Sequence, residues 1–144
     1  MTPAFLRTGV AAIAFVGALA FAAPSMAAMM NFKANLNGKS EVPPNTTAGT
    51  GSVTATYDTD SKKLTWKGSY SGLTGAATAA HFHGPAPAGK NAGVMVPISP
   101  ATSPLEGSAT LTDAQAKALM DGDMYVNVHT AANKGGEIRG QLTK

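Results

Sequence analysis

Short runs of alternating apolar and polar residues, separated by turn residues, fill the chain from residue 32 onward. Residues 32–36 alternate in this way before Asn37-Gly38, and residues 53–57 do so before a polar turn. Such alternation is typical of β-strands with one buried face. Similar runs lie at about residues 64–70, 76–83, 93–98, 105–111, 124–129 and 136–142. The pattern predicts an all-β fold, an antiparallel Greek-key β-sandwich or barrel of about eight strands.

One segment has the spacing of a helix instead. Thr112 is a candidate N-cap, and Gln115, three residues later, completes a capping box. Apolar residues at helical spacing follow, and Gly122 stands where a C-cap is expected. We therefore expect one short helix at about residues 113–120.

The first 27 residues have the pattern of a secretory signal peptide. Arg7 precedes an apolar run of 15 residues, 9–23, and Ser25-Met26-Ala27 supplies small residues at a cleavage site. The run is shorter than the roughly 20 residues that a membrane-spanning helix needs. We expect cleavage after Ala27, with Ala28 as the alternative, and a single mature domain, 28–144. The pattern thus predicts a periplasmic or secreted protein with no stable membrane insertion after cleavage.

Composition removes several function classes. The chain has no cysteine, which excludes a disulfide framework, cysteine-ligated metal sites and thiol catalysis. Its formal net charge of +3 is small and its lysines are scattered, so a nucleic-acid partner is not expected. Stability must then come from the apolar core, for which Trp66 is the largest single candidate.

The three histidines of the chain all lie in strand-like runs. Because successive side chains of a strand point to opposite faces, His81 and His83 share the face opposite Phe82. The same alternation places other polar residues opposite the apolar face of the last two strands: Tyr125, Asn127 and His129 in one, and Glu137 and Arg139 in the other. The short segment 130–135 between these strands predicts a hairpin.

A metal site follows if the strand at 76–83 lies beside this hairpin. Three imidazoles suit copper, zinc or non-haem iron, with copper favoured, and leave one position open. Glu137 is then a candidate fourth ligand or an acceptor for an imidazole N–H, with Asn127 and Tyr125 as orienting groups. The alternative is that the histidines are ordinary polar residues of a solvated sheet face, where Glu137 and Arg139 form ion pairs.

Several motifs, in this order, resemble the chordin-domain (CHRD) family in its single-domain, secreted bacterial type. They are Phe32-Lys33-Ala34-Asn35-Leu36-Asn37-Gly38, Glu41-Val42-Pro43-Pro44, Ala80-His81-Phe82-His83-Gly84-Pro85, Tyr125-Val126-Asn127-Val128-His129-Thr130 and Gly136-Glu137-Ile138-Arg139-Gly140-Gln141-Leu142. The resemblance implies a compact all-β extracellular module without a settled biochemical activity. Glu41 belongs to the family's pattern, and a structural pairing with Arg139 is expected for it.

Three interpretations of function remain open. The first is a periplasmic or extracellular binding module with a transition-metal site at His81, His83 and His129. The second is a structural or adhesive module whose polar face binds a protein or a glycan, with no metal. The third is a copper-dependent enzyme similar to superoxide dismutase, suggested by a looser likeness to copper–zinc superoxide dismutases. We expect a binding module rather than an enzyme, and assign no catalytic residue.

Overall fold

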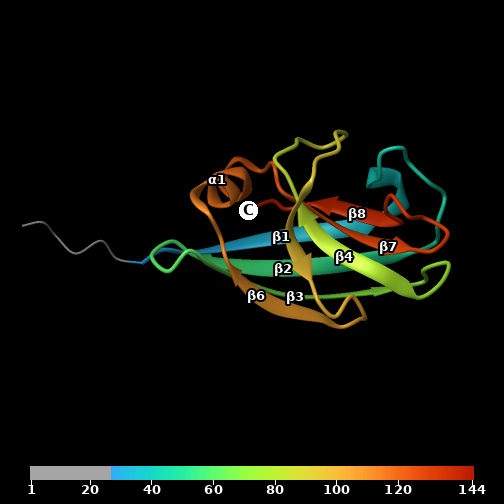
Figure 1. Ribbon diagram of the computed structural model, residues 1–144, viewed down its shortest axis with the longest axis horizontal. Helices are drawn as coiled ribbons and strands as arrows, with labels where there is room; N and C mark the ends of the chain where they lie inside the picture. The colour runs from blue at the N-terminus through green and yellow to red at the C-terminus, as the bar shows by residue number, and fades with distance from the viewer. Residues whose placement is uncertain (1–26) are drawn as a thin grey trace, which may run out of the picture.

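The computed structural model describes residues 27–144 (Figure 1), so the predicted signal peptide lies almost wholly outside the described residues and stays a prediction. The described chain forms eight strands, a short 3-10 helix at Gly38–Ser40 and one α-helix, α1 (Asp113–Asp121). The strands are β1 (Met29–Asn37), β2 (Thr50–Asp58), β3 (Lys63–Ser71), β4 (Ala77–His83), β5 (Val94–Ile98), β6 (Leu105–Thr110), β7 (Tyr125–Thr130) and β8 (Ile138–Gln141).

All eight strands belong to one sheet, in the order β5-β4-β7-β8-β1-β2-β3-β6. Every neighbouring pair is antiparallel. The sheet curls into a nearly closed barrel, with β4, β7 and β8 on one side and β1, β2 and β3 on the other (Figure 1). The prediction of an all-β antiparallel fold of eight strands is therefore confirmed.

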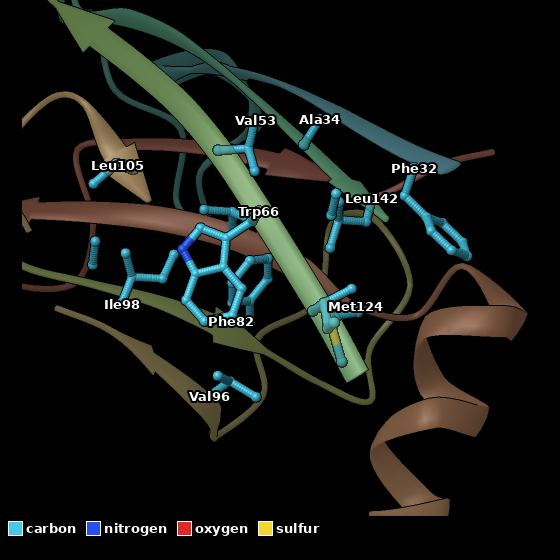
Figure 2. Packing of buried hydrophobic residues seen from close by; sticks show 14 of the residues in the cluster. Phe32, Ala34, Val53, Trp66, Phe82, Val96, Ile98, Leu105, Met124 and Leu142 are labelled. Atoms are coloured by element: carbon cyan, nitrogen blue, oxygen red, sulfur yellow. The ribbon is translucent and has the colours of Figure 1, made fainter. Parts of the chain in front are cut away.

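The apolar faces of the strands meet inside the barrel. Trp66 of β3 and Phe82 of β4 pack edge to face at its centre, with ring centroids 5.0 Å apart and an interplanar angle of 67° (Figure 2). Both side chains are buried, as are Val126 and Val128 of β7. Trp66 is thus a core residue, as predicted. Edge-to-face aromatic pairs add about 0.5–1.5 kcal/mol beyond the area that they bury.

Helix α1 lies at one end of the barrel (Figure 1). The predicted capping box is present: the Gln115 N–H donates to the Thr112 hydroxyl, and the Thr112 N–H donates to the Gln115 side chain. Gly122 ends the helix in the left-handed conformation, with φ 81°. The helix extends one residue beyond the predicted end, to Asp121, and its Leu119 is buried in the core.

The segment 84–93 folds back over the outer face of the sheet. Its main chain accepts hydrogen bonds from side chains of the strands below, including Arg139 Nη2 to Lys90 O (2.6 Å) and Gln141 Nε2 to Ala86 O (2.8 Å). A strand face that points away from the core is therefore covered rather than solvated. Arg139 retains only 1% of its accessible surface.

Candidate functional site

Strand pairing brings the three histidines together. β7 lies between β4 and β8, and β4 pairs with β7 so that His81 is opposite Asn127 and Ala79 is opposite His129. The hairpin of the last two strands and its place beside the strand at 76–83 are therefore both confirmed. Because His81 and His129 are diagonal neighbours on one face, their side chains reach each other.

The imidazole nitrogens converge. His81 Nδ1 and His129 Nε2 are 3.1 Å apart, and one nitrogen from each of the three rings lies within 4.8 Å of the others. Two nitrogens bound to one ion at 2.0–2.1 Å are about 3–3.5 Å apart at tetrahedral or square angles. The first pair has this spacing and is joined by a hydrogen bond, in which His81 Nδ1–H donates to His129 Nε2 because His129 Nδ1 already donates to Lys134 O. A shared ion would take the place of that hydrogen, and a side-chain shift of about 1–2 Å would bring the third nitrogen to the same spacing.

Main-chain carbonyls orient two of the rings. His83 Nδ1 lies 3.0 Å from Ala92 O, and His129 Nδ1 lies 2.9 Å from Lys134 O. A carbonyl oxygen only accepts, so each Nδ1 must carry the hydrogen and the Nε2 of the neutral ring must carry the lone pair. Such hydrogen bonds from the remote nitrogen are what fix metal-binding histidines in proteins.

The Nε2 of His83 is buried and has no hydrogen-bond partner. Buried polar atoms are nearly always paired, and an unpaired one calls for an explanation. His83 also stacks on Tyr125, with centroids 5.0 Å apart and planes 5° apart, so its ring has little freedom to turn away. Since Nδ1 is bonded to Ala92 O, Nε2 is the nitrogen of His83 that is left to bind a ligand.

The environment favours the neutral form of His81 and His83. Burial lowers the pKa of His81, and the nearby His129 and His83 rings lower it further. Burial also lowers the pKa of His83, against a smaller opposite effect of the Ala92 carbonyl. A lone pair is available for a ligand bond only on the neutral ring, so both shifts favour metal binding near neutral pH.

A cavity of about 430 Å³ opens beside His81 and His129. Its other lining residues come from β4, from the end of β7 and from the turn after it, among them Ala79, Thr130 and Ala131. Through this cavity a small molecule can reach the histidine cluster from the side of His81 and His129. Both histidines are partly exposed, whereas His83 is buried.

Glu137 lies away from the imidazoles. Its carboxylate accepts five hydrogen bonds, from Thr47 Oγ1, Thr74 N, Thr74 Oγ1, Thr130 Oγ1 and Asn133 Nδ2, at 2.6–3.1 Å. Burial raises the pKa of this carboxyl, but the threonine hydrogen bonds outweigh that effect and lower the pKa to about 2. Its partners are hydroxyl, amide and main-chain groups, so the structure does not bring it to the histidines as a fourth ligand or imidazole acceptor.

The guanidinium of Arg139 stacks on the ring of Tyr125 beside the histidine cluster. The guanidinium carbon lies 3.4 Å from the centroid of the Tyr125 ring, and Arg139 Nη1 donates to Asn91 Oδ1 at 3.0 Å. The Tyr125 hydroxyl donates to Ala92 O, the same carbonyl that orients His83. Tyr125 therefore contacts His83 by stacking and shares the Ala92 carbonyl with it, while its role in orienting a metal ligand stays a prediction.

Glu41 and Asn127 lie next to each other behind Gly136. A Cβ added at Gly136 would lie 2.6 Å from Asn127 Nδ2 and against Glu41 Oε1. Burial raises the pKa of Glu41 to about 7, although the Arg139 charge opposes this. Within residues 27–144, no ion pair joins Arg139 to Glu41 or Glu137, so the expected pairing of Glu41 with Arg139 is not formed.

Sequence reasoning missed the groups that support these residues. Thr47, Thr74 and Asn133 around Glu137 lie in loops, and Thr130 ends β7. The oxygens that orient His83 and His129 belong to the main chain. Every residue has a carbonyl, so no side-chain pattern could have identified Ala92 or Lys134. For Glu137, the only indication in the sequence was that it is a polar residue between two segments with the pattern of buried strands.

The geometry defines an all-β domain with a histidine cluster on the outer face of its sheet. The family model for the CHRD domain matches residues 32–142, which is most of the chain, and the chain therefore belongs to the CHRD domain family. No curated protein and no solved structure shows a significant match. In the part of the chain that the structure describes, no helix has the length and apolarity to cross a membrane.

Proposed function

We propose that this protein is an exported binding module that holds one transition-metal ion through His81, His83 and His129. The observation that carries the proposal is the buried, unpartnered Nε2 of His83. A metal ion shared with the other two rings would occupy that lone pair. Export is supported by the pattern of residues 1–27 and would place the site in the periplasm or outside the cell.

Copper is the metal we favour. All three ligands are imidazoles, which bind copper, zinc and iron, and copper(II) forms the strongest complexes of the divalent first-row series. The set contains no thiolate or carboxylate, because the chain lacks cysteine and both Glu137 oxygens are engaged. The three nitrogens would leave coordination positions open toward the cavity beside His81 and His129.

Titration calorimetry with copper(II) and with zinc tests the proposal. We expect one ion per chain and tighter binding of copper. In the copper form, electron paramagnetic resonance should show coupling to imidazole nitrogen, which must come from the cluster because the chain has three histidines in all.

A His81→Ala/His83→Ala double variant should lose this binding. The matched control is Lys134→Ala, an exposed change that leaves the Lys134 carbonyl in place to orient His129. Unchanged copper affinity in a folded double variant would disprove the assignment. Circular dichroism and the fluorescence of Trp66 verify folding.

A second candidate function is superoxide dismutation at the same copper. It is favoured by the cavity, which gives a small substrate access to the open side of the cluster. The test is superoxide turnover by the copper-loaded protein, lost on demetallation and restored by copper alone. If copper binds without turnover, the binding module stands and the enzyme is excluded. An adhesive module would show neither copper binding nor superoxide turnover, and would instead bind a protein partner.

A further inference from the structure

Arg139 is a buried cation without an ion pair. Its side chain is 1% exposed, and within residues 27–144 no salt bridge joins it to a carboxylate. Taking a guanidinium out of water is costly unless acceptors match its N–H groups. The partners of Arg139 therefore show what its burial achieves, and they lead to His83 by two routes.

The first route is through the covering segment, residues 84–93. Arg139 Nη1 donates to Asn91 Oδ1 at 3.0 Å, and Nη2 donates to Lys90 O at 2.6 Å. Both bonds hold the segment against the sheet. The next residue, Ala92, carries the carbonyl that lies 3.0 Å from His83 Nδ1. The position of this carbonyl is thus set by the two residues directly before it, which Arg139 holds.

The second route is through Tyr125. The guanidinium carbon lies 3.4 Å from the centroid of the Tyr125 ring, and the same ring stacks on His83 with planes 5° apart. Since β7 lies between β4 and β8, Tyr125 meets a side chain from each neighbouring strand. Its hydroxyl accepts from Ala92 N at 3.0 Å and donates to Ala92 O at 3.2 Å. Tyr125 therefore connects Arg139 both to the ring of His83 and to the carbonyl that His83 contacts.

Both routes act on the hydrogen of the His83 ring. A neutral imidazole can carry its hydrogen on either nitrogen, and only the nitrogen without it can bind a metal. The Ala92 carbonyl keeps the hydrogen on Nδ1 and leaves Nε2, which is buried and unpartnered, with its lone pair. If this carbonyl moves away, the form with hydrogen on Nε2 becomes accessible, and that form has no lone pair on Nε2.

We propose that Arg139 is a positioning residue of the metal site, which holds Tyr125 and the covering segment so that His83 keeps its hydrogen on Nδ1. A guanidinium suits this task because it donates in its plane while its face stacks on an aromatic ring. Groups that orient metal-binding histidines contribute about 10–100-fold to metal affinity. The inference rests on the proposed function for the metal, but the hydrogen of His83 can be located in the metal-free protein.

His129 provides an internal comparison. Its Nδ1 lies 2.9 Å from Lys134 O, in the connection between β7 and β8. Arg139 donates to the covering segment and not to this connection. The hydrogen on His129 Nδ1 is therefore expected to be independent of Arg139, although both histidines belong to the same cluster.

Long-range proton–nitrogen NMR of the full chain, with EDTA present, shows which nitrogen of each histidine carries the hydrogen. The chain has three histidines, so single alanine variants assign their signals. In the wild type we expect His83 and His129 with hydrogen on Nδ1. In Arg139→Met, which keeps a long side chain but lacks the guanidinium, His83 should acquire a population with hydrogen on Nε2, while His129 should not. An unchanged His83 in the folded variant, or an equal change at His129, would overturn the proposal.

A second pair of variants tests the same link at exposed residues, where folding is retained. Asn91→Ala removes the acceptor of Arg139 Nη1 and should change His83 in the same direction. The matched control is Asn31→Ala, which removes an exposed acceptor of Thr56 Oγ1 between β1 and β2 and should leave His83 as in the wild type. Identical His83 signals in these two variants would also overturn the proposal.

Copper titration of the same variants separates this inference from the proposed function. We expect copper affinity to fall by about 10–100-fold in Arg139→Met and in Asn91→Ala, and to be unchanged in Asn31→Ala. Wild-type affinity in both of the first two variants would overturn the role of Arg139. If the wild type itself binds no copper, the proposed function fails, whereas the NMR of metal-free His83 still decides whether Arg139 positions it.

Discussion

The carboxylate of Glu137 is expected to be a major source of stability, and Glu137→Gln tests this. The substitution keeps the shape of the side chain but removes its charge and places an N–H₂ group where an accepting oxygen stood. The side chain is fully buried and accepts five hydrogen bonds from residues in three other segments of the chain. At least one donor among them must lose its acceptor or turn away.

The size of the effect follows from the pKa of this carboxyl. Its pKa is about 2 in the folded protein and 4.5 as the usual value, a difference that corresponds to about 3 kcal/mol. Since the pKa is depressed on folding, this stability is present above pH 4.5 and is lost as the pH falls toward 2. For a domain of this size, about 3 kcal/mol lowers the melting temperature by about 10–15 °C.

Urea unfolding, followed by the fluorescence of Trp66, measures the difference. Trp66 is the one tryptophan of the chain and is buried, so its emission reports unfolding. We expect Glu137→Gln to lower the free energy of unfolding by about 3 kcal/mol at pH 7, and by progressively less between pH 4.5 and 2. The exposed control Glu106→Gln should change it by at most about 0.5 kcal/mol. If the difference in unfolding free energy between Glu137→Gln and the wild type does not shrink between pH 4.5 and 2, the Glu137 carboxylate is not the source of this stability.

Three further predictions use the same unfolding measurement. Phe82→Ala removes the buried partner of Trp66 and should cost about 3–5 kcal/mol; a cost below about 1 kcal/mol would contradict the central place of this pair. Glu41→Gln should become more stable relative to the wild type as the pH rises from 4.5 to 8, with its free energy of unfolding rising by about 3 kcal/mol against that of the wild type. The reason is that burial raises the pKa of Glu41 to about 7, so that ionisation of this carboxyl destabilises the folded wild type over that range. A difference in unfolding free energy that does not change with pH would count against this prediction. Gly136→Ala should cost at least about 1–3 kcal/mol, since φ is 131° and the added Cβ meets Asn127 Nδ2 and Glu41 Oε1; a neutral change would contradict the crowding.

The strands and their faces were predictable because alternation is a local property. The valines of β7 enter the core and His129 does not, as period-2 spacing requires. The same rule placed His81 and His83 opposite Phe82. Which strands lie side by side is a non-local property, so the convergence of the three rings required the structure. It depends on β7 lying beside β4, far away in the sequence.

The surroundings of the cluster were less accessible from the sequence. The main chain of the segment 84–93 covers the outer face of the sheet and buries Arg139, and no side-chain pattern of this segment indicates that contact. Glu137 departs from the expected row because β8 begins only at Ile138 and the chain turns at Gly136 with φ 131°. Alternation holds within a strand and does not extend through such a turn.

The position of β1 has a consequence for how the chain acquires its fold. β1 pairs with β2 along its length, from Met29 opposite Asp58 to Asn37 opposite Thr50, and with β8 on its other side. Lys33 and Thr143 also exchange two main-chain hydrogen bonds, at 2.8 and 2.9 Å. The first and last strands are therefore neighbours within the sheet.

A chain that is still being synthesised lacks β8 and with it the second partner of β1. It also lacks Arg139, which anchors the covering segment, and Glu137, which joins two loops to the end of β7. The barrel can close only when the C-terminal residues arrive. The order of the strands thus delays closure of the barrel until the whole domain has been synthesised.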